Sequence, residues 1–432
     1  MIERRSTVRQ FLVVLGSVAP LTAATGQTPV EFAVIADVSS CLAVRARPQS
    51  SAPSIACLTS GTRVKAVGSA PYWRNVQLED GRTGWAAKKF LEMVAAPPAT
   101  PGVGDRDDAW LEIHVVDVGQ GDGIWIHTFD DNIPGNGRYE GYNIIVDGGP
   151  NRYLPDNKLL LYVLNQAYTR APIDALIITH PHVDHFPGAL GIMDSLEVRE
   201  FYDSGYPKSG TRWSSFLARV GRETYKGQST VRHIGRSALG QPEWGSELEV
   251  RILYAYTGRT SGFGTQANTR ENNASIVFRI RYGTQSILFM GDAEGKDRED
   301  APDLAQYAER FLLDSVGAGQ IRSTVLKIGH HGSETSSTLP FIAAVDPDFV
   351  VVSSGRENFN GTYLPDASTL ARYCDRKPAT LIYRTDQDDE AEGRTEKTDA
   401  DGDHIVISTN GKETRIQGHS AGSPITPTTC VP

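Results

Sequence analysis

The spacing of apolar and polar positions changes near residue 100, which divides the chain into two parts. Upstream, short runs of alternating apolar and polar residues are bounded by turn residues, a pattern typical of strands in a small all-β barrel. The Asp80-Gly81 pair lies between two such runs and is a strong hairpin signal. The predicted strands cover residues 31–35, 42–45, 62–67, 73–78 and 83–86.

Downstream of Trp110, longer apolar runs alternate with candidate helices, which predicts a layered α/β domain. The candidate strands are 111–118, 124–126, 143–146, 175–178, 274–280, 286–290, 324–328, 349–352 and 380–383, and the candidate helices are 156–168, 188–195 and 303–314. Residues 95–109 are rich in Pro, Gly and Ala and predict a linker, and residues 416–432 predict an irregular tail.

The first residues follow a different pattern. Arg4, Arg5 and Arg9 precede or flank the apolar run 11–15, and small residues follow at 23–26. This order predicts a secretory signal peptide over 1–26, so we expect an exported protein, periplasmic or extracellular. The apolar run is shorter than the roughly 20 residues that span a bilayer, so no transmembrane domain is expected in the mature chain. An uncleaved anchor is the alternative.

Cysteines and charge add to this picture. The four cysteines suit an exported protein, with Cys41 bridged to Cys57 and Cys374 to Cys430, although sequence does not choose among the three pairings. A formal net charge of -9 argues against non-specific binding of nucleic acid. Between Arg199 and Arg236 eight Lys and Arg outnumber three acids. This segment is either a solvated surface or a positive rim for a phosphate-bearing substrate.

The densest chemistry follows the apolar run 175–178. His180, His182, Asp184 and His185 offer four potential metal ligands within six residues. Packing alone does not explain such crowding, because desolvated imidazoles and carboxylates recover their cost only through a cation or mutual pairing.

Three further predicted strands end in groups of the same kind. Asp292 follows one, the pair His330-His331 follows another, and Asp147 ends a third. Strand ends that converge at one edge of layered sheets build a site on rigid elements. A carboxylate flanked by imidazoles fits two divalent ions about 3.5–4 Å apart.

The run from His180 to His185 matches the H-x-H-x-D-H signature, and residues 110–415 resemble the metallo-β-lactamase fold superfamily. The resemblance implies a four-layer αββα sandwich. It also implies that His180 and His182 bind one metal and Asp184 and His185 the other. Asp292 would bridge them, and His330 or His331 would complete the second site. The early strand-end Asp147 would orient loop residues without binding metal.

Several runs narrow the resemblance to the hydrolase domain of ComEC-type DNA-uptake proteins. They are Val116 to Asp122, Asn272 to Ser275, Gly291-Asp292, Lys327 to Ser333 and Tyr383 to Asp386. The wider group is thought to hydrolyse phosphodiesters with a metal-activated water at a two-metal site.

For such a reaction we hypothesise specific roles for these residues. Asp184, Asp292 and His331 are the expected catalytic residues. Asn273, Ser275 and Ser333 would donate hydrogen bonds to the phosphate. Gln120 and Asp122 would orient the ligands from behind.

One departure concerns the first metal. The superfamily usually has a further His before the bridging Asp, and the one His in that interval is His233, which we interpret as a core or surface residue. A water, Asn273 or one of the paired His330 and His331 would then be the third ligand. Zinc suits this ligand set, with manganese as the alternative.

The N-terminal part has its own resemblance. Leu42 to Pro48, Leu58 to Val64, Trp73 and Gly81 to Ala86 resemble the bacterial SH3-like family over residues 31–94. This implies binding of a cell-wall or protein ligand. Trp73, Trp85 and Tyr72 either line a groove or fill a small core.

Together these features predict an exported metal-dependent hydrolase, a phosphodiesterase or nuclease that acts on a phosphate ester or nucleic acid. A lactamase or lactonase of the same fold and a non-catalytic envelope-binding protein are the alternatives.

Overall fold

The computed structural model describes residues 31–34, 41–59, 62–70, 73–78, 81–93, 110–128, 141–166, 172–245, 247–256, 258, 262–359, 361–387, 402–420, 423–424 and 427–429. The predicted signal peptide, the predicted linker, Tyr72 and Cys430 lie outside the described residues.

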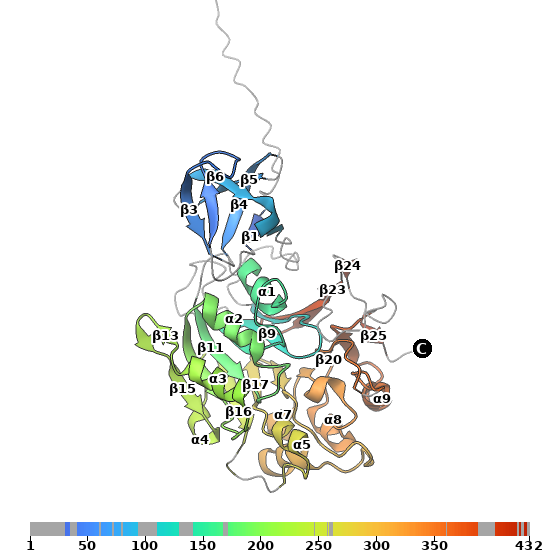
Figure 1. Ribbon diagram of the computed structural model, residues 1–432. Coiled ribbons are helices and arrows are strands. Elements are labelled where there is room, and N and C mark those ends of the chain that lie inside the picture. The colour runs from blue at the N-terminus through green and yellow to red at the C-terminus, as the bar shows by residue number, and fades with distance from the viewer. Residues whose placement is uncertain are drawn as a thin grey trace, which may run out of the picture.

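The N-terminal part forms one antiparallel seven-stranded sheet that curls into a barrel, with strand order β3-β2-β6-β5-β4-β1-β7 (Figure 1). Its strands are β1 (Glu31–Val34), β2 (Leu42–Arg45), β3 (Ser54–Leu58), β4 (Arg63–Ala70), β5 (Trp73–Gln77), β6 (Thr83–Ala87) and β7 (Leu91–Met93), and η1 (Lys88–Phe90) precedes the last. The predicted hairpin is confirmed, because Gln77 of β5 pairs with Thr83 of β6.

A small apolar core and a disulfide hold this barrel. The alternating residues Val44, Val64 and Val76 are buried together. The predicted bridge between Cys41 and Cys57 is confirmed and ties the start of β2 to β3. Cys374, in the C-terminal part, is also disulfide-bonded.

The larger part contains two mixed sheets. The nine-stranded sheet has the order β15-β12-β11-β10-β9-β8-β22-β23-β24. Its strands are β8 (Leu111–Val115), β9 (Gly123–His127), β10 (Asn143–Gly148), β11 (Ile173–Ile178), β12 (Val198–Asp203), β15 (Val231–Ile234), β22 (His404–Thr409), β23 (Thr414–Ser420) and β24 (Ser423–Pro424).

The second sheet has seven strands in the order β16-β17-β18-β19-β20-β21-β25. They are β16 (Leu248–Tyr254), β17 (Val277–Tyr282), β18 (Gln285–Phe289), β19 (Val325–Lys327), β20 (Phe349–Val352), β21 (Leu381–Arg384) and β25 (Thr428–Thr429). A separate hairpin joins β13 (Thr224–Tyr225) to β14 (Gln228–Ser229).

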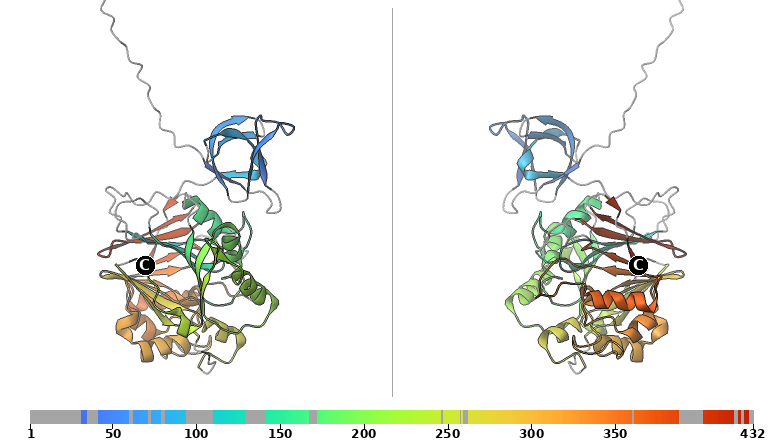
Figure 2. Two further views of the ribbon diagram at one scale, coloured as in Figure 1. Left: turned by 90° about the vertical axis from the view of Figure 1, so that its left-hand side faces the viewer. Right: turned by 90° about the vertical axis from the view of Figure 1, so that its right-hand side faces the viewer.

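Helices cover the outer faces of both sheets (Figure 2). The helices α1 (Lys158–Gln166), α2 (Pro187–Ser195) and α3 (Thr211–Val220) share a core with the first sheet. The second sheet packs against α6 (Tyr307–Phe311), η2 (Leu312–Val316), α7 (Ala318–Ile321), α8 (Leu339–Val345) and α9 (Ala367–Arg376). The remaining short helices of this part are α4 (Arg236–Leu239), α5 (Ala267–Asn272) and η3 (Gly329–Gly332).

A third apolar core lies between the sheets and joins β8 to β11 with β16 to β20. With one core between the sheets and one under each helical layer, the four-layer αββα architecture is confirmed. The strands with candidate ligands end together, since β10 runs parallel to β11 and β18 runs parallel to β19. The amide of Ile276, just before β17, donates to the carbonyl of Thr179, just after β11, at 3.0 Å, which links the two sheets at this edge.

The expectation of an irregular tail from residue 416 is wrong. Residues 416–420 continue β23, in which Ile416 pairs with Ile407 of β22, and β25 adds an antiparallel edge to the second sheet. The alternation Arg415-Ile416-Gln417 suits a half-buried edge strand, although Ser, Thr and Pro in the tail obscure it. Among the helices of the described residues, none has the length and apolar character that a bilayer crossing requires.

Gly188 at the start of α2 gives a first prediction. A Cβ there would lie 1.8 Å from the carbonyl oxygen of Gly148 in β10, so backbone would have to move. We expect Gly188→Ala to lower the free energy of unfolding by about 3 kcal/mol in urea titrations. Gly319→Ala in α7 is the control, because its Cβ would meet nothing within 4 Å. Equal stability of both variants would contradict the predicted packing of α2 on β10.

Candidate metal centre

The signature loop lies between β11 and α2. Its backbone is held by the amide of His185, which donates to the carbonyl of His182 at 3.1 Å, and by the amide of Gly148, which donates to the carbonyl of His185 at 2.5 Å. The side chains of His180 and His185 are fully buried, whereas those of His182 and Asp184 are 19% and 23% exposed. The loop therefore supplies both the floor and the rim of one site.

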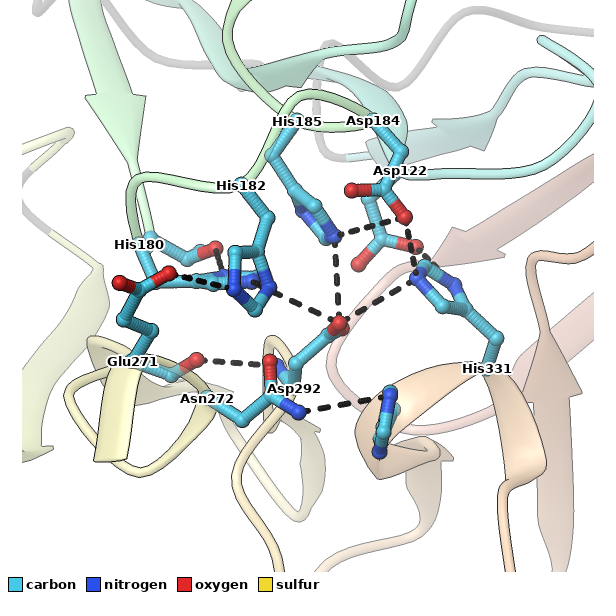
Figure 3. Close-up of polar contacts among 12 residues, drawn as sticks. Asp122, His180, His182, Asp184, His185, Glu271, Asn272, Asp292 and His331 are labelled. Carbon is cyan, nitrogen blue, oxygen red and sulfur yellow. Dashed lines mark hydrogen bonds and ion pairs between the residues drawn. The ribbon is translucent and has the colours of Figure 1, made fainter. Parts of the chain in front are cut away.

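Two groups of side chains meet at Asp292, which follows β18 (Figure 3). One group is Asp184, His185, Asp292 and His331, and the other is His180, His182 and Asp292. Within each group the candidate ligand atoms all lie within 4.8 Å of one another. The Oδ2 atom of Asp292 lies 3.3 Å from the Nε2 of His185, 3.4 Å from that of His331 and 3.5 Å from that of His180.

Each imidazole is held from outside by its second nitrogen. The Nδ1 atom of His185 contacts Oδ2 of Asp147 at 2.8 Å, and Nδ1 of His331 contacts the carbonyl oxygen of Ser353 at 2.8 Å. The Nδ1 atom of His180 contacts the hydroxyl of Thr179 at 3.1 Å, and Nε2 of His182 contacts a carboxylate oxygen of Glu271 at 2.8 Å. Such outer contacts fix tautomer and ring orientation in metal sites.

The inward-facing atoms test whether a cation fits. The buried Nε2 atoms of His185 and His331 and the buried Oδ1 of Asp292 make no hydrogen bond. The two ring nitrogens lie 3.3 Å and 3.4 Å from Oδ2 of Asp292, and a divalent cation would satisfy these buried atoms together. Mixed imidazole and carboxylate donors suit zinc and manganese. The residues present therefore fit the metal that the fold implies.

Electrostatics couple these groups closely. Burial opposes ionisation of Asp292, but the imidazoles of His331 and His185 outweigh it and hold the pKa of this carboxyl well below its usual range. Burial likewise disfavours the imidazolium forms, yet the carboxylate of Asp292 and its neighbours raise the pKa of His185 and of His331 well above the usual value. Without metal, protons take the place of the cation, so metal binding releases protons.

The paired histidines after β19 separate in space. His330 and His331 have φ values of 48° and 52°, and their rings are inclined at 62° with centroids 6.2 Å apart. His331 joins the group around Asp292, whereas Nδ1 of His330 lies 3.0 Å from a carboxylate oxygen of Glu294. Left-handed backbone at two consecutive histidines is unfavourable and persists only where the surroundings hold it. Of the two histidines, between which the sequence did not choose, His331 is the one that joins a group of candidate ligands.

The predicted phosphate donors occupy different positions from those expected. Asn273 is buried, its amide nitrogen donates to the carbonyl of Thr269 at 3.0 Å, and its oxygen accepts from the amide of Glu294 at 3.0 Å. The buried hydroxyl of Ser275 accepts from the amide of Asp292 at 3.0 Å. Ser333 is 3% exposed and contacts Thr335. This placement argues against a role as open phosphate donors, because all three side chains are buried and the amide of Asn273 already donates within the fold.

The same placement argues against Asn273 as third ligand of the first metal. Its neighbour Asn272 donates to Glu294 at 3.0 Å, and the buried Oδ1 of Asn272 makes no hydrogen bond. His233 lies on the edge strand β15, stacked on Tyr202 with centroids 4.4 Å apart, which agrees with its interpretation as a surface residue.

Asp122 and Gln120 stand behind the second group. The carboxylate of Asp122 lies 2.6 Å from the ammonium of Lys327 and 3.5 Å from Nδ1 of His331. Gln120 does not contact a candidate ligand directly. Its side-chain oxygen accepts from the amide of Gly355 at 3.3 Å, two residues after Ser353, whose carbonyl holds His331. Between them, Gly121 has φ 135°, and a Cβ there would lie 2.2 Å from the carbonyl oxygen of Asp184, so glycine is required for this close approach.

Two polar residues at the rim were not predicted as site residues. Glu271, at the end of α5, contacts His182, and Lys208 contacts the same carboxylate oxygen of Glu271 at 2.5 Å. Glu271 directly precedes the Asn272-Asn273 run, and Lys208 belongs to the basic segment 199–236. The Asn272-Asn273 run and the basic segment were thus the sequence features that could have pointed to these residues. Neither feature shows that a side chain contacts His182 in the folded chain.

Comparison with known proteins gives two family matches. The family described as "Metallo-beta-lactamase superfamily" matches residues 138–356, and the family described as "Bacterial SH3 domain" matches residues 40–92.

Similar proteins include "Uncharacterized protein YcaI" of Escherichia coli (strain K12), 26% identical over 268 residues, which are 62% of this chain and 28% of that protein. "ComE operon protein 3" of Bacillus subtilis (strain 168) is 24% identical over 289 residues, which are 64% of this chain and 32% of that protein. The chain thus spans less than a third of the length of either relative. Among solved structures, the metallo-beta-lactamase fold protein YhfI from Bacillus subtilis matches with a TM-score of 0.37 and 12% identity, over 64% of this chain and 96% of that one.

Proposed function

The chain belongs to the metallo-beta-lactamase superfamily, and on that premise we propose that it is an exported metal-dependent phosphodiesterase. The observation that carries the proposal is the shared carboxylate of Asp292, which belongs to both groups of candidate ligands. Such an arrangement suits two divalent ions that act on one phosphoryl group. The resemblance of residues 116–122 and 327–333 to the hydrolase domain of ComEC-type DNA-uptake proteins supports a phosphate-ester substrate over a lactam.

Each residue has a proposed role. His180 and His182 would hold one ion, and Asp184, His185 and His331 the other, with Asp292 between them. Asn272 Oδ1 or a water would complete the first ion's shell. Bound divalent ions supply Lewis acidity, which lowers the pKa of water and polarises a phosphoryl oxygen.

The chain's own groups position the reactants. Asp184 is 23% exposed and lies 3.5 Å from Nε2 of His331, so its carboxylate can accept a hydrogen bond from a water at the open side of the site. The buried floor of His180, His185 and Asp292 excludes solvent from the other side. Asp147 holds Nδ1 of His185, and Glu271 holds Nε2 of His182. The other nitrogen of each ring therefore points into the site. The SH3-like part would bring this site to an envelope ligand.

The test uses the purified chain with its metal content measured. We expect hydrolysis of bis-p-nitrophenyl phosphate, its loss on chelation and its recovery with zinc or manganese. A chromogenic cephalosporin should be left intact. Hydrolysis of the cephalosporin without the phosphodiester would overturn the proposal in favour of a lactamase, and a metal-free, inactive protein would favour a binding role.

A further inference from the structure

The mouth of the candidate site is marked by a gradient of exposure. The candidate ligands His180, His185, Asp292 and His331 have side chains no more than 2% exposed, whereas His182 and Asp184 are 19% and 23% exposed. Val183, between them, is 40% exposed. A substrate therefore reaches the site past His182 and Asp184.

Two lysines contact carboxylates that touch the candidate ligands, and they lie in different environments. Lys327 is 1% exposed and pairs with buried Asp122, so it has no access to a substrate. Lys208 is 23% exposed and pairs with Glu271 at 2.5 Å, on the same oxygen that lies 2.8 Å from His182. Figure 3 shows Glu271 on the outer side of His182, away from Asp292.

The loop that carries Lys208 holds it at this place. This loop joins β12 to α3, and the amide of Lys208 donates to the carbonyl of Tyr206 at 2.8 Å. Tyr206 in turn packs edge-on against Tyr256, with centroids 5.1 Å apart. The ammonium group of Lys208 has three N–H donors. The contact with one carboxylate oxygen of Glu271 uses one of them, so donors remain for a second acceptor.

We propose that Lys208 is a substrate-positioning residue that binds a non-bridging phosphoryl oxygen and makes the site selective for anionic phosphate esters. This inference rests on the proposed function and names its substrate class more closely. The ammonium is 23% exposed and contacts the Glu271 oxygen that holds His182, the exposed member of the first group of ligands. An anionic ester that enters past His182 therefore meets a positive charge amid the carboxylates of the site. Glu271 limits the motion of Lys208 when no substrate is present.

Three other basic residues of this segment bind within the fold. Arg199 pairs with Asp174, Arg219 pairs with Glu223, and Arg236 donates to the carbonyl of Leu253 at 3.0 Å. Lys208 is the basic residue of the segment that contacts a carboxylate next to a candidate ligand, which makes a single substitution informative.

The experiment measures the binding of inorganic phosphate to the metal-loaded protein by calorimetry, together with metal content. We expect Lys208→Gln to raise the Kd for phosphate roughly 10- to 100-fold, as for loss of a charge-assisted hydrogen bond, with metal content unchanged. Its KM for bis-p-nitrophenyl phosphate should rise more than its kcat falls. Lys208→Arg should restore most of the phosphate binding. Arg212→Gln, at an exposed position of α3, is the matched control and should behave as wild type.

The outcomes separate the two proposals. Unchanged phosphate binding in Lys208→Gln, absence of phosphate binding in the wild type, or loss of metal together with phosphate binding would each overturn the role of Lys208. Loss of metal together with phosphate binding would mean that Lys208 supports metal binding by positioning His182 through Glu271. Failure of the wild type to cleave the diester, with phosphate binding still dependent on Lys208, would instead overturn the proposed reaction alone.

Discussion

Replacing His331 by Ala is expected to remove one of the two proposed metal ions and to lower the proposed phosphodiester hydrolysis by roughly 10³-fold or more. The Nε2 of His331 lies 3.5 Å from Asp184 and 3.4 Å from Asp292, so its loss removes an inward nitrogen from the second group. The several kcal/mol of charge stabilisation that a metal supplies correspond to a loss of this size. Metal content by mass spectrometry and initial rates would measure both effects.

The neighbouring histidine is a matched control for this result. His330→Ala changes the same residue type one position away, but that imidazole is directed to Glu294 and Thr335. We therefore expect His330→Ala to retain both ions. Retention of two ions by His331→Ala, with loss in His330→Ala, would reverse the assignment of the two residues.

Replacing Lys327 by Met is expected to destabilise the fold by about 3–5 kcal/mol, because it leaves the carboxylate of Asp122 buried without its cation. The pair is 2.6 Å apart, and the two side chains are 1% and 2% exposed. Burial alone would raise the pKa of Asp122, and Lys327 with His331 lowers it below its usual value. Urea unfolding at neutral pH would measure the loss. Methionine keeps most of the side-chain volume, so the change reports charge more than packing.

The sign of the pH dependence follows from the same pair. In the wild type the pKa of Asp122 is lower in the folded protein than in the unfolded chain. Its contribution to the free energy of unfolding is therefore present above the pKa of the unfolded chain and disappears at acid pH. In Lys327→Met the pKa of Asp122 in the folded protein should rise. The loss of unfolding free energy relative to the wild type should therefore shrink as the pH falls. The double variant Lys327→Met with Asp122→Asn should recover more than half of the lost stability. Additive losses in the double variant would show that the two side chains do not act as a pair.

Local features of the chain predicted the strands that carry the candidate ligands, but not β12, β15, β16 and β22. Apolar runs followed by polar groups after residues 146, 178, 290 and 328 correspond to strand ends, because the alternation that makes a strand is encoded within five to eight residues. The His180 to His185 spacing was informative for the same reason, since its four potential ligands lie in one loop. The tail strands β23 and β25 were missed because their pairing with β22 and β21 outweighs a composition typical of loops.

What the sequence determined by itself, then, was the strands that carry the candidate ligands, the α/β class, the resemblance that implies four layers, and the group of residues from which a metal site could be drawn. The tertiary structure decided which members face inward. Adjacent histidines diverge through two left-handed backbone conformations, Asn273 is engaged within the fold, and Glu271 and Lys208 reach His182 from distant segments. These choices depend on φ and ψ at single residues and on packing between segments more than 60 positions apart, which no local pattern encodes.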